Sequence, residues 1–312
     1  NTMKIIFIDS VHPYLKEKLT QQDYKCDDYS KESKSKILLD IKNYDGLVIR
    51  SRFKIDKKFI DKAENLKFIA RAGSGLENID TLYAKKKNII CYNTAEGNRQ
   101  AVAEHALAML LNLMNRINIA DSEVRNGIWK REENRGEEIS GKTVGIIGCG
   151  NVGSAFAKLL TGFNTKILSY DINLKSYQYQ SSLKQIFQYS DIVSIHIPYN
   201  KDNRYYINKD FIYKFKKPIY IINTSRGNCL NTSDLIEGLR SDKIKGACLD
   251  VLEYENKSFE NLMLENNHDL QNLIKHKNVI LSPHIAGWSH ESYLKISQVL
   301  YQKICRDFIL GS

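Results

Sequence analysis

The chain has 312 residues, 42% of them hydrophobic, and a formal net charge of +10. That length suffices for two domains with sizeable cores. No basic run is interleaved with stacking aromatic residues, so we expect a Lys-rich surface and no nucleic-acid partner. An anionic metabolite is the alternative explanation of the charge.

The sequence also lacks the signals of membrane insertion and secretion. No apolar run reaches the ~18 residues that a membrane span needs, and residues 3–8 have a strand pattern instead of a signal peptide. The six cysteines are scattered without a C-x-x-C pair, which argues against zinc and against a disulfide framework. We therefore expect no metal, no membrane partner and a cytoplasmic location.

The first hundred residues alternate short apolar runs with amphipathic segments. The runs predict strands over 4–8, 46–49, 68–70 and 89–92. The amphipathic segments predict helices over 14–21, 34–41, 57–62 and 80–86. Strands that alternate with helices indicate an α/β fold with a parallel sheet covered on both faces.

A long helix is predicted next, over 101–126, with Gly127 as its stop. It is apolar around much of its circumference, which is typical of a helix buried on several sides. A second alternating block follows, with strands over 143–147, 166–170, 192–195, 219–223, 246–249 and 279–281. This block predicts a second doubly wound domain of the dinucleotide-binding kind, and a last helix is predicted over 291–309.

A glycine fingerprint opens the second block, between a buried strand and a helix over 154–160. Gly148 permits the tight turn, Gly150 lets the backbone approach a pyrophosphate, and Gly153 allows close packing of helix on strand. The amides of Asn151 and Val152 lie where a helix N-terminus favours phosphate. These five residues therefore predict a dinucleotide site.

Asp171 ends the next strand, 18 residues after Gly153. This is close to the spacing of ~20 expected for the acid that binds the adenosine ribose. A carboxylate there repels a 2′-phosphate, so we expect NAD and not NADP. The alternative is a turn residue or a helix cap.

Three further short motifs lie at or after the ends of predicted strands, at residues 223–227, 250–255 and 282–287. They contain Arg226, Glu255 and His284, and ligands bind outside the carboxyl ends of strands in open α/β sheets. A guanidinium can hold a substrate carboxylate, and an imidazole oriented by a carboxylate can transfer a proton to a carbonyl oxygen. Each residue alone has a plain alternative: a surface ion pair, a solvated loop acid or a buried imidazole.

Together these motifs resemble the D-isomer-specific 2-hydroxyacid dehydrogenase family, particularly its D-3-phosphoglycerate dehydrogenase branch, from about residue 50 onward. The resemblance implies two doubly wound parallel-sheet domains. A Rossmann NAD-binding domain, 99–287, is inserted in a flavodoxin-like substrate domain, 1–98 with 288–312. It also implies a homodimer, with the long helix at the interface.

The resemblance implies further site residues. Cofactor contacts are expected at Val102, His196, Pro198, Thr224, Asp250 and Gly287. Substrate contacts are expected at Arg50, Ser51, Gly73, Ser74, Gly75 and Asn98. The glycine-rich loop that contains Gly73, Ser74 and Gly75 could instead be a simple strand-to-helix turn. Pro198 could be only a strand terminator, and His105 could be a structural residue or a support for the site.

The implied activity is NAD-dependent interconversion of a D-2-hydroxy acid and its 2-keto acid, with 3-phosphoglycerate and serine synthesis as the leading expectation. Arg50, Lys130, Arg131 and Arg135 could bind the phosphate or be plain surface cations. The alternatives are a glyoxylate/hydroxypyruvate or D-lactate-type reductase, and, in another class, an NAD(H)-sensing corepressor or scaffold.

The sequence departs from the family pattern at three positions. Asn256 and Ala95 stand where the family has Pro, and Phe53 where it has Thr. These departures leave the expected chemistry in place but weaken the prediction of the substrate. We also expect a short form of the enzyme, without a regulatory domain.

Overall fold

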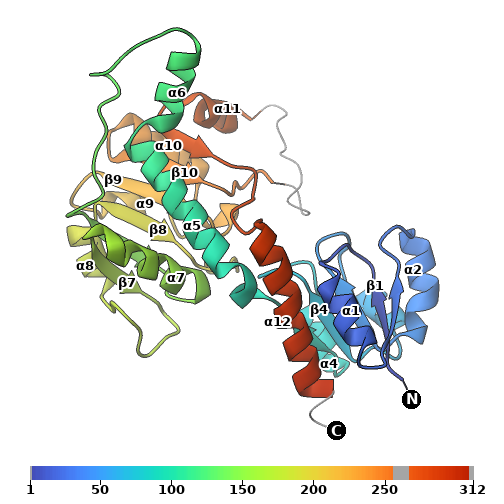
Figure 1. The fold of residues 1–312 in the computed structure, drawn as a ribbon. Coiled ribbons are helices and arrows are strands. Elements are labelled where there is room, and N and C mark those ends of the chain that lie inside the picture. Colours follow the sequence, from blue (N-terminus) through green and yellow to red (C-terminus); the bar gives the residue numbers. More distant parts are fainter. Residues whose placement is uncertain (1, 256–266, 309–312) are drawn as a thin grey trace. The chain divides into compact units, whose positions relative to one another are not determined.

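The computed structural model describes residues 2–255 and 267–308 and divides into two compact units (Figure 1). The first unit contains Asn1–Asn98 and Trp288–Ser312, and the second contains Arg99–Gly287. The chain therefore passes from one unit to the other twice. Asn256 and Ile309, which the sequence analysis names, lie outside the described residues.

The first unit is built on a parallel sheet with the strand order β2-β1-β3-β4-β5, which is the flavodoxin-like order. Its strands are β1 (Lys4–Phe7), β2 (Lys25–Asp28), β3 (Gly46–Ile49), β4 (Phe68–Arg71) and β5 (Ile90–Tyr92). The sequence predicts all of them except β2. That strand, Lys-Cys-Asp-Asp, lies at an edge and has no buried residue, so it carries no apolar run.

Helices cover both faces of this sheet. They are α1 (Tyr14–Thr20), α2 (Lys34–Asp40), η1 (Ile41–Asn43), α3 (Lys57–Lys62), α4 (Thr81–Lys86) and α12 (His290–Phe308). One core contains buried side chains from α2, α3 and α4. The other joins Leu15 and Leu19 of α1 to Leu300 and Ile304 of α12, which is why the C-terminal helix belongs to the first unit.

The second unit contains a six-stranded parallel sheet with the order β11-β10-β9-β8-β6-β7. Its strands are β6 (Thr143–Ile147), β7 (Lys166–Tyr170), β8 (Ile192–Ile195), β9 (Ile219–Asn223), β10 (Ile244–Leu249) and β11 (Val279–Leu281). An isolated parallel bridge between Ser169 and Gln180 stands where a further strand would pair with β7. With that bridge counted, the order is that of a Rossmann sheet.

Two cores lie on the two faces of this sheet. Side chains from α5 (Ala95–Met114) and α7 (Asn151–Leu160) fill one core. The other is filled from α8 (Leu183–Tyr189), α9 (Lys209–Tyr213), α10 (Thr232–Arg240) and α11 (His268–Lys275). The remaining helical segments are α6 (Ile117–Arg125), η2 (Thr161–Phe163) and η3 (Gly227–Cys229).

The single long helix predicted over 101–126 is wrong, because the structure has two helices there. Helix α5 starts at Ala95 and ends at Met114, and α6 starts at Ile117. Arg116 adopts the left-handed conformation, with φ of +56°, and ends the first helix. Asn112 accepts the amide of Asn118 at 2.9 Å, a side-chain-to-backbone bond that competes with helix continuation.

Candidate active site

The dinucleotide loop follows β6 and opens α7. Gly148 has φ of +91°, and a Cβ there would meet the His196 carbonyl oxygen at 2.6 Å. A Cβ on Gly153 would collide with the Gly148 carbonyl oxygen. Gly150 precedes α7 and supplies no side-chain cap, so the first-turn amides of Asn151 and Val152 meet no side chain from that position. The backbone therefore fits a phosphate at this helix N-terminus.

Asp171 is tied into this loop by three backbone amides. Its carboxylate accepts Cys149 N at 2.8 Å, Asn173 N at 2.8 Å and Leu174 N at 3.2 Å. A carboxylate has about four acceptor positions, so one is left for a ribose hydroxyl. Asp171 thus acts as a turn residue and also retains the capacity expected of a ribose acid.

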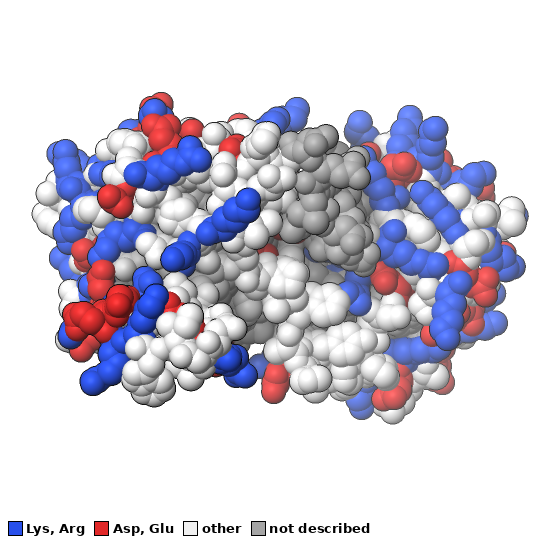
Figure 2. Space-filling view, turned by 90° about the horizontal axis from the view of Figure 1, so that it is seen from above, with Lys and Arg blue, Asp and Glu red and all other residues white. Residues whose placement is uncertain are grey.

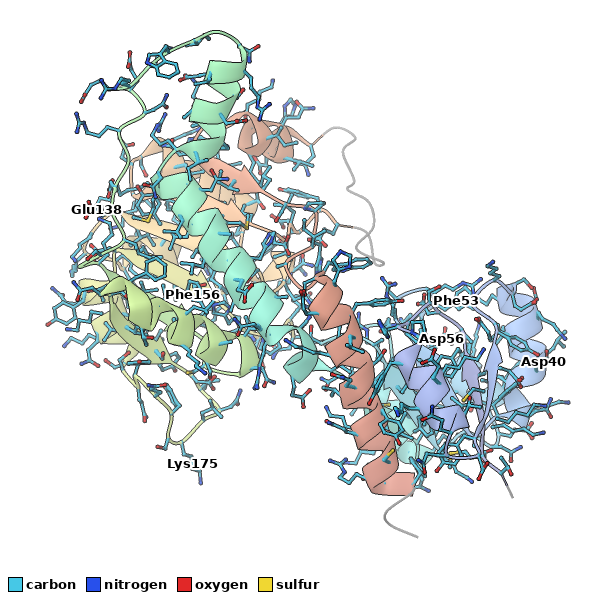
Figure 3. All side chains as sticks on the ribbon, in the orientation of Figure 1. Asp40, Phe53, Asp56, Glu138, Phe156 and Lys175 are labelled. Atoms are coloured by element: carbon cyan, nitrogen blue, oxygen red, sulfur yellow. The ribbon has the colours of Figure 1, made fainter. Side chains whose placement is uncertain are left out.

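His196 and Thr224 are two further polar residues of the expected cofactor surface. The His196 Nε2 atom lies 2.8 Å from Ser194 Oγ, and its ring lies 5.6 Å from the buried ring of Phe156 on α7. Phe156 is labelled in Figure 3. Burial lowers the pKa of His196 to about 3, so its imidazole is neutral at physiological pH, although the residue keeps some exposed surface. Within the described chain, the buried Thr224 Oγ1 has no hydrogen-bond partner, which fits a polar ligand group.

The positions of Val102, Pro198 and Gly287 give no specific indication of a cofactor contact. Val102 is 6% exposed and packs inside the protein on α5. Pro198 is exposed, and its carbonyl accepts Asn203 Nδ2 at 2.7 Å. Gly287 is the last residue of the second unit.

Glu255 and His284 form a direct pair. His284 Nδ1 lies 2.6 Å from Glu255 Oε2, and the Leu252 amide donates to Glu255 Oε1 at 2.6 Å. The two side chains are 24% and 11% exposed. An ionised carboxylate only accepts, so Nδ1 donates its proton, and the second ring nitrogen is the one with the chemistry to exchange a proton.

Arg226 lies at the end of β9, beside the ends of β10 and β11 that precede the other two residues. Its guanidinium donates to the Ser225 carbonyl at 2.8 Å, and Asn223 Nδ2 donates to the Arg226 carbonyl at 3.1 Å. A Cβ on Gly227 would collide with the backbone of Leu252. The loop that carries Arg226 therefore packs directly on the segment that leads to Glu255.

Asp250 has a role that the sequence does not reveal. It is 2% exposed, and its carboxylate accepts Ser282 Oγ at 2.5 Å, Ile285 N at 2.9 Å and Ala286 N at 2.8 Å. Its carbonyl accepts the His284 amide at 2.8 Å. His284 is left-handed, with φ of +57°, which costs about 1 kcal/mol that these bonds must offset.

The first expected substrate segment is shaped by Asp9, which sequence reasoning missed. Asp9 Oδ2 accepts the amides of Arg50, Ser51 and Arg52 at 3.0, 3.0 and 3.1 Å. The Arg50 guanidinium lies 4.6 Å from the ring centre of Trp288, which is 68% exposed.

The substrate-side glycine-rich loop, residues 73–75, is held in place by hydrogen bonds to its carbonyl oxygens. Buried Arg71 donates to the carbonyls of Arg50 and Gly75 at 3.1 and 2.6 Å, and Asn93 Nδ2 donates to the Ser74 carbonyl at 2.9 Å. Gly73 O accepts the Thr94 amide at 2.9 Å. Within residues 2–255 and 267–308, the amides of Ser74 and Gly75 have no acceptor, so this loop fits an anion-binding nest.

Asn98 and Phe53 complete the expected substrate surface. Asn98 Oδ1 is buried and has no hydrogen-bond partner among the described residues. Phe53, which is labelled in Figure 3 and replaces the threonine of the family pattern, has its ring centre 4.7 Å from the Arg52 guanidinium carbon. That replacement therefore has a packing role in this chain.

On the face shown in Figure 2, Lys and Arg are interspersed with acidic and neutral residues. Lys130 lies 3.9 Å from Glu123, and Arg135 pairs with Glu132 at 2.7 Å. Two of the cations proposed for phosphate binding thus already have an acidic partner nearby in sequence, on α6 or in the loop after it.

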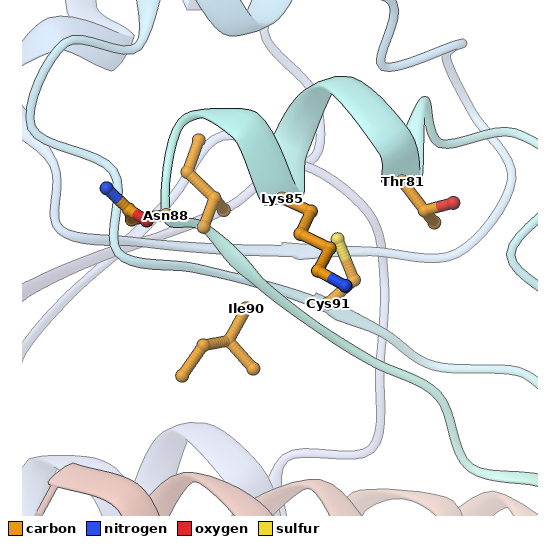
Figure 4. Close-up of a pocket in the computed structure, with 6 residues that line it drawn as sticks. Thr81, Lys85, Asn88, Ile90 and Cys91 are labelled. Carbon is orange, nitrogen blue, oxygen red and sulfur yellow. The ribbon is translucent and has the colours of Figure 1, made fainter.

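The described residues contain no cluster of His, Cys, Asp or Glu that could hold a metal, and none of their helices is long and apolar enough to cross a membrane. A pocket of about 440 Å³ lies at the edge strand β5 of the first unit (Figure 4). Its lining includes Lys85, Ile90 and Cys91 but none of the expected site residues.

Comparison with known proteins identifies the family. The model of the D-isomer specific 2-hydroxyacid dehydrogenase NAD binding domain matches residues 107–286. The chain belongs to this family. The second unit is therefore its NAD-binding domain, and the glycine loop and Asp171 are the parts of that domain where the structure fits the cofactor.

The relatives in this dehydrogenase family differ in substrate. Hydroxypyruvate reductase of Thermotoga maritima is 34% identical, over 88% of this chain and 88% of its own length. D-3-phosphoglycerate dehydrogenase of Archaeoglobus fulgidus is 32% identical over 87% of this chain, which spans only 51% of that relative. D-lactate dehydrogenase of Aquifex aeolicus, solved with NAD and lactic acid, has a TM-score of 0.82 at 27% identity, covering 99% of this chain and 96% of its own.

Proposed function

We propose that the chain is an NAD-dependent dehydrogenase that interconverts a D-2-hydroxy acid and its 2-keto acid, with 3-phosphoglycerate and 3-phosphohydroxypyruvate as the preferred pair. The observation that carries the proposal is the 2.6 Å contact between Glu255 and His284 at neighbouring strand ends of an NAD-binding domain. With this substrate pair, the reaction would serve serine synthesis.

The bound cofactor supplies a hydride in reduction and accepts one in oxidation. In reduction, His284 donates a proton from its second ring nitrogen to the carbonyl oxygen as negative charge grows there. In oxidation, the same nitrogen accepts the hydroxyl proton. Glu255 orients the ring through Nδ1 and stabilises the imidazolium form.

Each unit offers its own candidate group for binding the substrate carboxylate in this proposal. Arg226 offers a planar fork of donors that matches a carboxylate. The amides of Ser74 and Gly75 offer an uncharged nest in the first unit.

Phosphate recognition is assigned to Arg50. Asp9 fixes the backbone of Arg50, and Trp288 supports the guanidinium from one face, so the cation is held in place before substrate binds. The second candidate is a hydroxypyruvate or glyoxylate reductase. It is favoured because the hydroxypyruvate reductase of T. maritima matches this chain over nearly its whole length.

A substrate panel at fixed NADH concentration separates these candidates. We expect 3-phosphohydroxypyruvate to exceed hydroxypyruvate, glyoxylate and pyruvate in kcat/KM by at least about tenfold, the loss expected when a charged group loses its partner. Equal values for phosphohydroxypyruvate and hydroxypyruvate contradict phosphate recognition. Tight NADH binding without turnover of any acid would instead favour an NAD(H)-sensing corepressor.

We also propose a homodimer that uses α6 and the loop after it. No residue of α6, all of which the structure describes, is buried in the single chain. Ile117, Val124, Ile128 and Trp129 are 55%, 52%, 42% and 78% exposed. Side chains of this size on one helix and its following loop are typical of a surface that a partner covers.

A further inference from the structure

A chain of hydrogen bonds links α5 to the segment that carries His284. His105 Nε2 lies 2.9 Å from Ser282 Oγ, and Ser282 Oγ lies 2.5 Å from Asp250 Oδ1. His105 Nε2 itself lies 3.6 Å from that oxygen, too far for a direct hydrogen bond. All four residues belong to the second unit.

The direction of this chain follows from what each group can donate. An ionised Asp250 can only accept, so the Ser282 hydroxyl donates its proton to Oδ1. The Ser282 oxygen is then an acceptor toward His105, which must carry a proton on Nε2. His105 is thereby assigned as a donor, whichever state its other ring nitrogen has.

The far end of the chain is the backbone around His284. The Asp250 carboxylate also accepts the amides of Ile285 and Ala286, and the Asp250 carbonyl accepts the amide of His284. These bonds hold His284 in its left-handed conformation, and its ring then meets Glu255. A change in the position of Asp250 therefore changes the position of the imidazole.

We propose that His105 is a positioning residue for the proton-transfer step, acting through Ser282 and Asp250 on His284. The predicted effects on kcat rest on the proposed dehydrogenase function. The hydrogen-bond chain itself belongs to the fold and does not depend on that function. A half-buried histidine that only fills space would need neither a donor at Nε2 nor a hydroxyl partner. Here the donor is matched to a serine whose own proton is committed to a buried carboxylate.

The test compares two substitutions of His105 in the full chain. In His105→Leu the volume is retained but the donor is lost, whereas the amide nitrogen of His105→Gln can take the place of Nε2. We expect His105→Leu to lower kcat by about 10- to 100-fold, since a small displacement of a reacting group has effects of that order. NADH affinity should stay within about twofold, and His105→Gln should retain kcat within about threefold.

Two further readouts separate positioning from general loosening. A misplaced proton donor slows proton transfer, so the solvent deuterium isotope effect on kcat should rise in His105→Leu and not in His105→Gln. Amide exchange in peptides covering 282–287 should speed up in His105→Leu. Glu104→Ala is the matched control, because Glu104 precedes His105 on α5 but is exposed and contacts Gln100.

The inference is overturned if His105→Leu has normal kcat and normal exchange at 282–287, or if His105→Gln is as impaired as His105→Leu. The exchange measurement needs no turnover. A wild-type chain inactive on every acid would count against the proposed function, and exchange alone would then decide whether His105 holds the 282–287 segment.

Discussion

The Glu255–His284 pair makes a quantitative prediction with an internal control. Glu255→Gln keeps the shape of the side chain but removes its charge, and the neutral amide can turn a donor toward Nδ1. A hydrogen bond to a charged group contributes about 1.5–3 kcal/mol, and about 1.4 kcal/mol corresponds to a factor of ten. We therefore expect Glu255→Gln to lower kcat by about 10- to 150-fold, with little change in NADH affinity.

Glu253 is the matched control, two residues earlier in the same loop. Its carboxylate accepts Tyr205 Oη at 2.6 Å through Oε2 and the Thr232 amide at 3.0 Å through Oε1, so each of its oxygens already has a donor partner. Glu253→Gln should lower the free energy of unfolding modestly and leave kcat within about twofold. The assay is steady-state oxidation of NADH by the best acid of the panel, with urea unfolding of both variants. Normal kcat in Glu255→Gln, or an equal fall in both variants, would refute the reasoning.

The other predictions concern His284, the cofactor, His196 and the proposed dimer. His284→Asn should retain NADH affinity and lose at least about 100-fold in turnover; near-normal turnover removes His284 from the mechanism. Asp171→Ala should weaken NADH binding and raise the relative use of NADPH, and an unchanged NADPH-to-NADH ratio of kcat/KM would mean that another group reads the ribose. Burial lowers the pKa of His196 to about 3, so its contribution to stability is complete above about pH 6.5 and is lost as pH falls from there toward 3. His196→Gln should make the loss of unfolding free energy between pH 7 and pH 5 smaller by about 2 kcal/mol in urea titrations; the same pH dependence in both proteins would contradict this. Trp129→Glu should convert the proposed dimer to a monomer in sedimentation experiments, and an unchanged mass would exclude this loop from the interface.

The sequence predicts the fold class well where burial alone decides the pattern. The strands of the second unit lie between helices on both faces, so they read as continuous apolar runs such as Thr143–Ile147 and Ile219–Asn223. The edge strand β2 is polar and was missed. The helix break at Arg116 was missed because a left-handed arginine has no sequence signal of its own.

The candidate site likewise has features that the sequence predicts and features that it does not. Parallel strand ends explain how Glu255 and His284, which are 29 residues apart, come within hydrogen-bond distance. The hydrogen bonds that support the site join residues far apart in the sequence, so the sequence alone could not predict them. Asp9 meets the amides around Ser51 across some forty residues of chain, and Ser282 meets His105 across 177. No local pattern encodes such contacts.

The most direct test of the account is the configuration of the product. The chain is incubated with NADH and 3-phosphohydroxypyruvate or hydroxypyruvate, and the hydroxy acid formed is separated on a chiral column. The account predicts NADH-dependent formation of the D-isomer alone. Formation of the L-isomer, or no NADH-dependent product from any small 2-keto acid, would contradict it.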